Sequence, residues 1–368
     1  MTRMSPPGKE AETSKPGRAR TRRQPPGMLE RPTLKQVAQL AGVAPMTASY
    51  ILNGIGKAHL FRPDTQQRVR EAAEQLRYRP NAGAKGIRSG RFGSLGILVS
   101  ERKLWLSNQL LYAVSQRTQE LQLNLLLNRV DLSPDRVQVL PPLLKQISCD
   151  GLIVNFPFSQ AGDELHRMLS DYLPTVWINT REAHDAVHTD EHAVGRLAVE
   201  HLVKLGHRRI AYFQYWVSAE DHHYSMRDRR AGYLDALVSV GLSPILCMRT
   251  DEAQTPADWR AFAEQILTDK ERPTAVICYG VFELDVVSLL AARLGLGVPR
   301  DLSIVVPYDS LYWRLHQTYT TINQRLDEVG RESVEMLLRK VAEPRKRQKS
   351  IAVAPTVDLG DSSSPPGG

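Results

Sequence analysis

The chain has 368 residues, of which 42% are hydrophobic and 24% charged, so it can bury the cores of two or three domains. Its formal charge of +8 is unevenly placed, because residues 1–90 carry 17 basic and 6 acidic side chains and the remainder carries 31 and 34. A basic N-terminal part joined to a mildly acidic body is typical of a nucleic-acid-binding module attached to a second domain.

Composition also argues against several other classes of protein. No apolar run approaches the ~20 residues of a membrane span, and the N-terminus lacks the apolar segment of a secretory signal. Cys149, Cys247 and Cys278 lie far apart in apolar contexts, and His222-His223 has no third ligand at a fixed spacing. We therefore expect a cytoplasmic protein with buried free thiols, no metal, no cofactor and no contact with a membrane.

Residues 1–31 are rich in Pro, Gly, Ser, Thr and Arg and contain almost nothing to bury. They are predicted to be a disordered basic arm. Such an arm could add non-specific contacts to DNA phosphates, or it could be a solvated tail without function.

Residues 33–53, TLKQVAQLAGVAPMTASYILN, are predicted to form two helices joined by a tight turn. Thr33 and Gln36 have the spacing of a capping box at the start of the first helix. Gly42 provides the positive φ that a sharp turn requires, and Pro45 suits the first turn of the second helix. The residues of the second helix that are expected to face outward are Met46, Ser49, Tyr50 and Asn53.

A third amphipathic helix is predicted over residues 64–76, and Tyr78-Arg79-Pro80-Asn81 ends it. The whole run (TLxxVAxxAGV, then TxS, LN and a helix ending in YxPN) resembles the DNA-binding headpiece of the lactose-repressor (LacI/GalR) family of bacterial transcription regulators. The resemblance covers roughly residues 33–89. It implies an all-α helix-turn-helix headpiece at 32–79 that presses its second helix into a DNA groove. A helical hairpin that only packs is the alternative.

Residues 80–94 are predicted to be a hinge. The family usually places here a short helix of the form NxxARxLxxG, which folds on DNA and wedges a Leu into the minor groove. Lys85 takes the basic position and Ile87 the wedge position, whereas Gly83 and Gly86 each cost a helix roughly 1 kcal/mol relative to Ala. We therefore expect a hinge that is disordered off DNA and only partly helical on it. A plain flexible linker is the alternative.

By the resemblance, Pro45, Met46 and Tyr50 hold the positions of the second helix that read base edges. None of them makes the bidentate contacts of Arg, Asn or Gln, so direct readout should be modest and hinge wedging or DNA shape more important. Thr47, Ser49 and Asn53 are better suited to phosphates, and a headpiece without specificity is the alternative. The candidate DNA-binding residues are Thr33, Pro45, Met46, Thr47, Ser49, Tyr50, Asn53, Asn81, Lys85 and Ile87.

From residue 95 onward, buried strands alternate with helices. The predicted strands are 95–100, 123–130, 150–156, 173–180, 208–213, 274–279 and 302–309. The predicted helices are 108–121, 137–147, 191–205, 229–241 and 281–294. This alternation implies right-handed βαβ crossovers and parallel sheets, and a dozen elements exceed one compact sheet. We therefore predict an α/β core of two doubly wound parallel-sheet lobes around a cleft.

The family resemblance continues to about residue 330, most clearly in HTDEHAVGRLAVEHLVKLGHRRIAYF at 188–213. It implies a periplasmic-binding-protein-like core over 95–360, with three strands crossing between the lobes. The expected divisions are an N-lobe at about 95–187 and 322–352, a C-lobe at about 188–321 and 353–360, and a disordered tail at 361–368. The tetramerising leucine heptads known in the family have no counterpart here, so a homodimer is expected.

The family's effector-contacting Arg falls at Arg229, whose guanidinium suits vicinal sugar hydroxyls or a carboxylate. A solvated Arg at a helix start is the alternative. The family's usual Asn-Asp falls at Gly280-Val281, so the Asp that holds sugar hydroxyls is absent, although Glu283 or Asp285 could compensate. Aromatic residues after strand ends could stack on a ring or belong to the core. The candidate effector-binding residues are Trp105, Phe156, Trp216, Arg229, Val281 and Phe282.

Two polar residues of the same region are expected to be structural. Asp190 precedes the helix predicted from Glu191 and suits its N-cap. His207 stands where that helix ends before the next strand.

Enzyme activity is not expected, because the chain has no GxSxG elbow, HExxH motif, P-loop or GxGxxG. The predicted function is a homodimeric, sequence-specific DNA-binding regulator, a repressor by family resemblance, acting on a pseudo-palindromic double-stranded operator. A small-molecule effector, expected to be a carbohydrate, would close the cleft and change the hinge spacing. The alternative is a cytoplasmic small-molecule binding protein with a vestigial headpiece.

Overall fold

The structure is a computed structural model, and the chain divides into two compact units, residues 1–82 and 83–368. The residues that it describes are 32–53, 58–79, 90–100, 107–130, 147–155, 163–215, 223–248, 255–308, 312–314 and 317–367. The predicted basic arm, hinge residues 80–89 and most of the helix expected at 137–147 lie outside these ranges.

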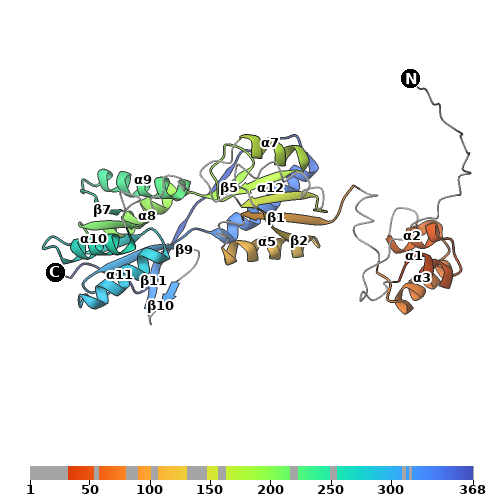
Figure 1. Ribbon diagram of the computed structural model, residues 1–368, viewed down its shortest axis with the longest axis horizontal. Helices are drawn as coiled ribbons and strands as arrows, with labels where there is room; N and C mark the ends of the chain where they lie inside the picture. Colours follow the sequence, from red (N-terminus) through yellow and green to blue (C-terminus); the bar gives the residue numbers. More distant parts are fainter. Residues whose placement is uncertain are drawn as a thin grey trace, which may run out of the picture. The chain divides into compact units, whose positions relative to one another are not determined.

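The first unit is a small helical headpiece (Figure 1). Its described elements are α1 (Leu34–Leu40), α2 (Pro45–Asn53), a 3-10 turn (Ala58–Leu60) and α3 (Pro63–Gln75). The predicted capping box is present, since Gln36 N donates to Thr33 Oγ1 at 3.3 Å and Thr33 N donates to Gln36 Oε1 at 2.7 Å. Gly42 has the positive φ predicted for the turn, +65°.

The headpiece helices share one core of small and branched side chains. Its buried members are Val37, Ala38, Ala41, Ala48, Ile51, Val69, Ala72 and Ala73. The expectation that Ser49 faces outward is wrong, because this residue is only 6% exposed. Ser49 stands three residues before Leu52, which packs against the core, and so shares its side of α2.

The second unit begins with a six-stranded parallel sheet, which defines the N-lobe. Its strand order is β12-β5-β4-β3-β1-β2. The strands are β1 (Ser94–Ser100), β2 (Asn124–Val130), β3 (Gly151–Asn155), β4 (Thr175–Ile178), β5 (Ala186–Thr189) and β12 (Ile351–Val353). The described helices are α5 (Asn108–Glu120), α7 (Asp163–Tyr172) and α12 (Leu326–Ala342).

Helices cover both faces of the N-lobe sheet. Leu165 and Leu169 of α7 pack with Trp177 of β4 on one face. On the other face α5 and α12 pack against β1, with Val114 and Leu337 fully buried. This arrangement confirms the predicted doubly wound parallel sheet, because crossovers on both faces are what such a sheet requires.

The C-lobe contains a second sheet, with the order β10-β11-β9-β8-β6-β7 and β13 paired with β11. The strands are β6 (Ile210–Gln214), β7 (Ile245–Met248), β8 (Ala275–Cys278), β9 (Ser303–Tyr308), β10 (Tyr312–Arg314), β11 (Gln317–Asn323) and β13 (Thr356–Asp358). The helices are α8 (Glu191–Lys204), α9 (Tyr224–Ser239), α10 (Pro256–Thr268) and α11 (Val281–Arg293). Helices α8 and α9 cover one face, and α10 and α11 cover the other (Figure 1).

Three segments of the chain connect the two sheets. They lie between β5 and α8, between β11 and α12, and between β12 and β13. The changes between lobes were expected at residues 188, 322 and 353, whereas β5 extends to Thr189 and β11 to Asn323. Three connections of this kind place the carboxyl ends of most parallel strands next to the gap between the lobes.

Several elements were not predicted from the sequence. Strands β5 and β7 have four residues each, too short for an alternating pattern to stand out. Helices α7, α10 and α12 were also missed. Helix α9, predicted to begin at Arg229, begins at Tyr224 instead, because the side chain of His223 accepts a hydrogen bond from Ser225 N and caps it.

The prediction of a disordered tail at 361–368 is wrong for residues 361–367. Ser362 is fully buried; its carbonyl accepts from Ile304 N at 2.8 Å and its hydroxyl accepts from Thr320 N at 2.9 Å. The carbonyl of Ser364 accepts from the ring of His207, which is itself buried and also contacts Ser303. The tail therefore completes the hydrogen bonding where β9 and β11 begin, and His207 has the predicted structural role.

Cys149, Cys247 and Cys278 are buried free thiols, as expected. Burial raises the pKa of Cys149 to about 11, so this thiol stays protonated at neutral pH. Among the described residues, no helix has the length and apolar character needed to cross a membrane.

Candidate functional site

The exposed side of α2 is the candidate DNA-binding surface. Pro45 is exposed and the side chain of Met46 is 64% exposed. Tyr50 is half-buried, and its ring stacks on Phe61 with centroids 6.4 Å apart. Thr33 is exposed as the N-cap of α1. This surface therefore combines apolar groups and one phenol, which can contact a thymine methyl or offer a single hydroxyl.

The remaining DNA-binding candidates are placed less uniformly. Thr47 is half-buried and Ser49 is buried, so Ser49 is not on this surface. Asn53 is the last residue of α2. The hinge candidates Asn81, Lys85 and Ile87 lie outside the described residues.

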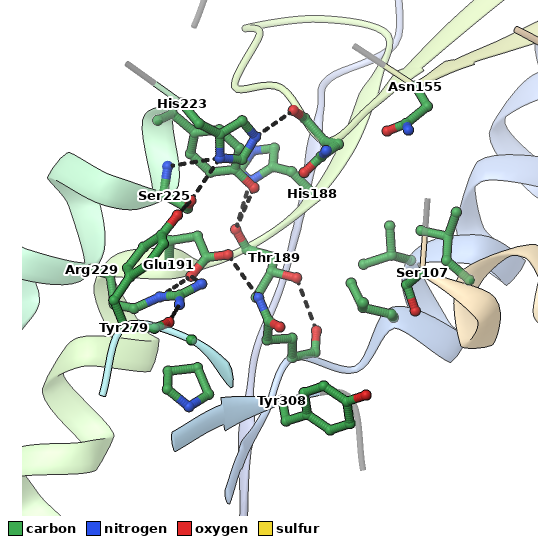
Figure 2. Close-up of a pocket in the computed structure, with 18 of the residues that line it drawn as sticks. Ser107, Asn155, His188, Thr189, Glu191, His223, Ser225, Arg229, Tyr279 and Tyr308 are labelled. Carbon is green, nitrogen blue, oxygen red and sulfur yellow. Dashed lines mark hydrogen bonds and ion pairs between the residues drawn. The ribbon is translucent and has the colours of Figure 1, made fainter. Parts of the chain in front are cut away.

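A cavity of about 440 Å³ lies between the N-lobe and the C-lobe. Figure 2 shows side chains from both lobes pointing into it. The described residues that line it are Ser107, Leu110, Asn155, Asn179, His188, Thr189, Glu191, His223, Tyr224, Ser225, Arg229, Tyr279, Gly280, Val281, Pro307, Tyr308, Gln324, Leu326 and Val329. Several follow or end parallel strands, which is where open α/β sheets bind their ligands.

A buried ion pair occupies the C-lobe wall of the cavity (Figure 2). Arg229 Nε and Nη2 donate to Glu191 Oε2 at 2.8 and 2.6 Å, and Gln324 Nε2 donates to Glu191 Oε1 at 3.0 Å. The guanidinium also donates to the carbonyl of Tyr279 and lies 4.6 Å from that residue's ring centroid. Burial is the largest single influence on Arg229 and lowers its pKa, but Glu191, Tyr279 and Tyr212 together outweigh burial, so the pKa stands above its ordinary value.

Close packing of α8 on α9 positions this pair. A Cβ added to Gly195 would clash with the carbonyl oxygen of Arg229, and one added to Gly232 would clash with the carbonyl oxygen of His192. Two glycines facing the opposite backbone therefore let the helices approach more closely than any side chain would allow. Asp190 caps α8 as predicted, accepting from Ala193 N at 3.0 Å.

A second polar chain links the two lobes through His223. Its Nε2 lies 2.9 Å from the carbonyl of Asn179 in the N-lobe, and a carbonyl only accepts, so Nε2 carries the proton. Its Nδ1 lies 2.6 Å from Ser225 Oγ, which lies 2.9 Å from the hydroxyl of Tyr279. Burial lowers the pKa of His223, so the ring is neutral at pH 7. Beside it, Arg181 of the N-lobe donates to Asp228 of α9 at 2.6 Å.

The effector candidates separate into three groups. Arg229 and Val281 line the cavity, and Arg229 is buried, contrary to a solvated Arg at a helix start. Phe282 is absent from the described lining residues and packs on Tyr215, with ring centroids 4.9 Å apart. Glu283 turns into the core, where it accepts from Tyr215 N at 2.8 Å and burial raises its pKa. Trp105, Phe156 and Trp216 lie outside the described residues.

Sequence reasoning missed most of the polar residues at the cavity. In the sequence, Glu191 is only the first residue of a predicted helix, and His223 is one of two neighbouring histidines without a third metal ligand. Asn155 and Asn179 stand at or just after the ends of β3 and β4, and this position was the available signal. Among the described residues, no cluster of His, Cys, Asp and Glu could hold a metal ion.

Comparisons with known proteins cover both units of the chain. A model described as bacterial regulatory proteins of the lacI family matches residues 33–81, and a periplasmic binding protein-like domain matches residues 199–363. The chain is 28% identical to the HTH-type transcriptional repressor PurR of Erwinia tasmaniensis over 338 residues, 88% of this chain and 95% of that repressor. It is 27% identical to PurR of Klebsiella pneumoniae over 332 residues, 88% of this chain and 94% of that repressor.

Solved structures share the fold. The lac repressor dimer bound to operator and the anti-inducer ONPF aligns with a TM-score of 0.75 and 23% identity, covering 91% of this chain and 100% of that chain. The complex of the transcriptional regulator CelR with cellobiose aligns with a TM-score of 0.59 and 24% identity, covering 90% and 100%. With a lacI-family headpiece, a periplasmic-binding-protein-like core and repressors matching along most of its length, the chain belongs to the LacI/GalR family of bacterial transcription regulators.

Proposed function

We propose that the chain is a DNA-binding transcriptional repressor whose affinity for its operator is controlled by a small molecule held between the N-lobe and the C-lobe. The observation that carries the proposal is the cavity, which takes polar side chains from both lobes and from a segment that connects them. A ligand that contacts both walls binds one arrangement of the lobes better than the other. It shifts their equilibrium by that difference in affinity.

The headpiece supplies the DNA-binding half of the function. Helix α2 exposes Pro45 and Met46 beside Tyr50, so it contributes few direct hydrogen bonds to bases. Much of the sequence preference then comes from the hinge wedge Ile87 and from DNA shape. A homodimer places two such helices in successive major grooves of a pseudo-palindrome, and the lac repressor neighbour, a dimer on its operator, supports this arrangement.

A carbohydrate is the proposed effector. The cavity offers amide, imidazole and phenol groups that match the hydroxyls of a sugar, among them Asn155, His188 and Tyr308. The aromatic faces of Tyr224 and Tyr279 suit its apolar ring face. The CelR neighbour, which holds cellobiose, supports this class. The regulator acts on cytoplasmic DNA, and the proposal assigns it no catalytic step.

Selection of random duplex DNA by the purified full-length chain tests the proposal. We expect enrichment of a palindrome, with binding that weakens steeply as salt rises because several phosphate contacts release counterions. The same selection with Ile87→Ala should give a weaker motif if the hinge wedges into the minor groove. Binding that is weak and blind to sequence at low salt would instead establish the alternative, a small-molecule binding protein with a vestigial headpiece.

A further inference from the structure

The charges on the described wall of the cavity between the lobes compensate each other. Among the described residues that line it, Glu191 is the only acidic side chain, and Arg229 is the only side chain of the Arg or Lys type. They face each other in one ion pair at 2.6 Å, with side chains that are 4% and 6% exposed. The rest of the described wall consists of amides, hydroxyls, imidazoles and apolar groups.

Both members of the pair also bind groups outside the pair. The carboxylate accepts Arg229 on Oε2 and Gln324 on Oε1. Gln324 is held in turn, because its carbonyl accepts from Thr189 Oγ1 at 2.9 Å. Three of the five N–H groups of the guanidinium donate to Glu191 and to the carbonyl of Tyr279, so two remain for a ligand.

The two remaining N–H groups suit a neutral oxygen better than an anionic one. A hydroxyl or carbonyl oxygen of a ligand can accept from them while the ion pair stays intact. A phosphate or carboxylate would bring a second negative charge beside the buried carboxylate of Glu191, where little water screens the repulsion. Displacing Glu191 to make room would leave its carboxylate buried without a partner, which is also unfavourable.

The imidazole of His223 does not supply a replacement cation. His223 donates to the Asn179 carbonyl and accepts from Ser225 N, so both ring nitrogens are engaged. Burial lowers the pKa of His223 and keeps its ring neutral at pH 7. The Nδ1 of His188 lies 3.0 Å from the carbonyl of Thr189, and its ring meets Tyr224 edge-on.

We propose that Glu191 is a specificity-determining residue that reserves the cavity for uncharged, hydrogen-bonding effectors and excludes phosphorylated or carboxylated ones. Arg229 alone would be an anion site, and Glu191 converts it into a donor for neutral oxygens. The role of Glu191 in selecting an effector rests on the proposed function. Its physical content, the neutralisation of Arg229 by Glu191, is testable without DNA.

The first test uses inorganic phosphate as the probe and the full-length chain as the protein. Titration calorimetry compares the wild type with Glu191→Gln, which keeps the shape and one acceptor oxygen but removes the charge. The matched control is Glu200→Gln, which removes a carboxylate that is half exposed on the same helix and pairs with Arg196. The double variant Glu191→Gln/Arg229→Gln removes both members of the pair.

We expect Glu191→Gln to bind phosphate about tenfold tighter or more than the wild type and Glu200→Gln. The gain should disappear in the double variant, because it depends on the unmasked guanidinium. Equal affinities in wild type and Glu191→Gln, or a gain that survives in the double variant, would overturn the assignment.

The second test needs no substitution at Glu191. It therefore shows whether the cavity excludes charged ligands even if Glu191→Gln does not fold. Wild-type chain is titrated with glucose, glucose 6-phosphate, glucuronate and inorganic phosphate. Phosphate or a charged sugar that binds more tightly than glucose, with the preference lost in Arg229→Gln, would overturn the assignment. We expect that neither phosphate nor a charged sugar binds more tightly than glucose. Failure of DNA selection, by contrast, would contradict only the proposed function.

Discussion

Gly195 of α8 lies directly against the backbone carbonyl of Arg229 in α9, with no space between them for a side-chain carbon. The same contact is repeated between Gly232 and the carbonyl of His192. Because Glu191 stands one turn before Gly195, this approach brings the carboxylate within reach of the guanidinium. The packing of two helices and the chemistry of the cavity therefore depend on the same two glycines.

Gly195→Ala should push α8 and α9 apart and lower the free energy of unfolding by about 3 kcal/mol, since the clash is with backbone that has no rotamer to change. Denaturant unfolding followed by fluorescence measures the change. Gly280→Ala is the matched control, because a Cβ there would meet its nearest neighbour, Glu283 Oε2, at an ordinary 3.5 Å. Similar losses at both positions would contradict the packing argument.

Arg229→Met should lower the free energy of unfolding by about 3–5 kcal/mol, because it leaves the Glu191 carboxylate buried without its cation. Adding Glu191→Gln to this variant should restore a large part of the stability, since no uncompensated charge then remains. A double-mutant cycle in urea measures the coupling. If the losses of unfolding free energy in the two single variants add up to the loss in the double variant, the two side chains do not act as a unit.

Stability should fall as pH drops below neutrality, and His223 should contribute to that fall. Burial holds the pKa of His223 below its ordinary value of 6.5 in the folded state, so between these two values the unfolded chain binds a proton that the folded chain does not. The contribution is complete above about pH 6.5 and is lost as pH falls toward the lower, folded-state value.

Urea unfolding of His223→Gln between pH 7 and pH 5 should therefore show a shallower pH dependence than the wild type. The slope will not vanish, because burial lowers the pKa of His201 and His207 as well. His192→Gln is the control, since the ring of His192 is 44% exposed and pairs with Asp235 at the surface. An unchanged slope in His223→Gln would show that its ring does not couple to folding.

Ser362→Ala should lower the free energy of unfolding by about 1–3 kcal/mol, because the buried N–H of Thr320 loses its acceptor. Ser364→Ala should change it by much less, since the Ser364 hydroxyl donates only to the exposed carbonyl of Pro365. Thermal unfolding of the two variants compares them directly. Equal, small effects would indicate that the C-terminal residues do not support β9 and β11.

Tyr50→Phe should keep the ring stacked on Phe61 and the headpiece folded, but weaken binding to the selected operator by about 1 kcal/mol through loss of one hydroxyl hydrogen bond. The slope of affinity against salt should stay the same, because a neutral hydroxyl releases no counterions from DNA. Fluorescence anisotropy at several salt concentrations measures both quantities. Unchanged affinity would show that the Tyr50 hydroxyl does not contact the operator, and a reduced slope would show that the substitution disturbs charged contacts elsewhere in the headpiece.

The sequence by itself determined the features that depend on residues a few positions apart. The capping box of Thr33 and Gln36, the left-handed Gly42 and the cap of Asp190 were all predicted, because each is a contact within one turn of chain. The long apolar strands, such as the one at 95–100, and the alternation with helices were also sufficient to predict two mainly parallel sheets, although β10 and β13 pair with β11 in the antiparallel sense. A strand that is buried on both faces is a continuous apolar run, and a helix that covers a sheet has one apolar face, so both patterns can be recognised in the local sequence.

The tertiary structure alone decided which of these residues meet. Glu191 and Arg229 are 38 positions apart, and only the crossing of α8 on α9 makes them a pair. Ser49 is buried although its neighbours suggested an outward face, and residues 361–367 are ordered although their composition predicted a tail. In each case a partner distant in the sequence supplies the burial or the hydrogen bond. Local periodicity carries no information about that partner, and so the charge balance of the cavity was visible only in the folded chain.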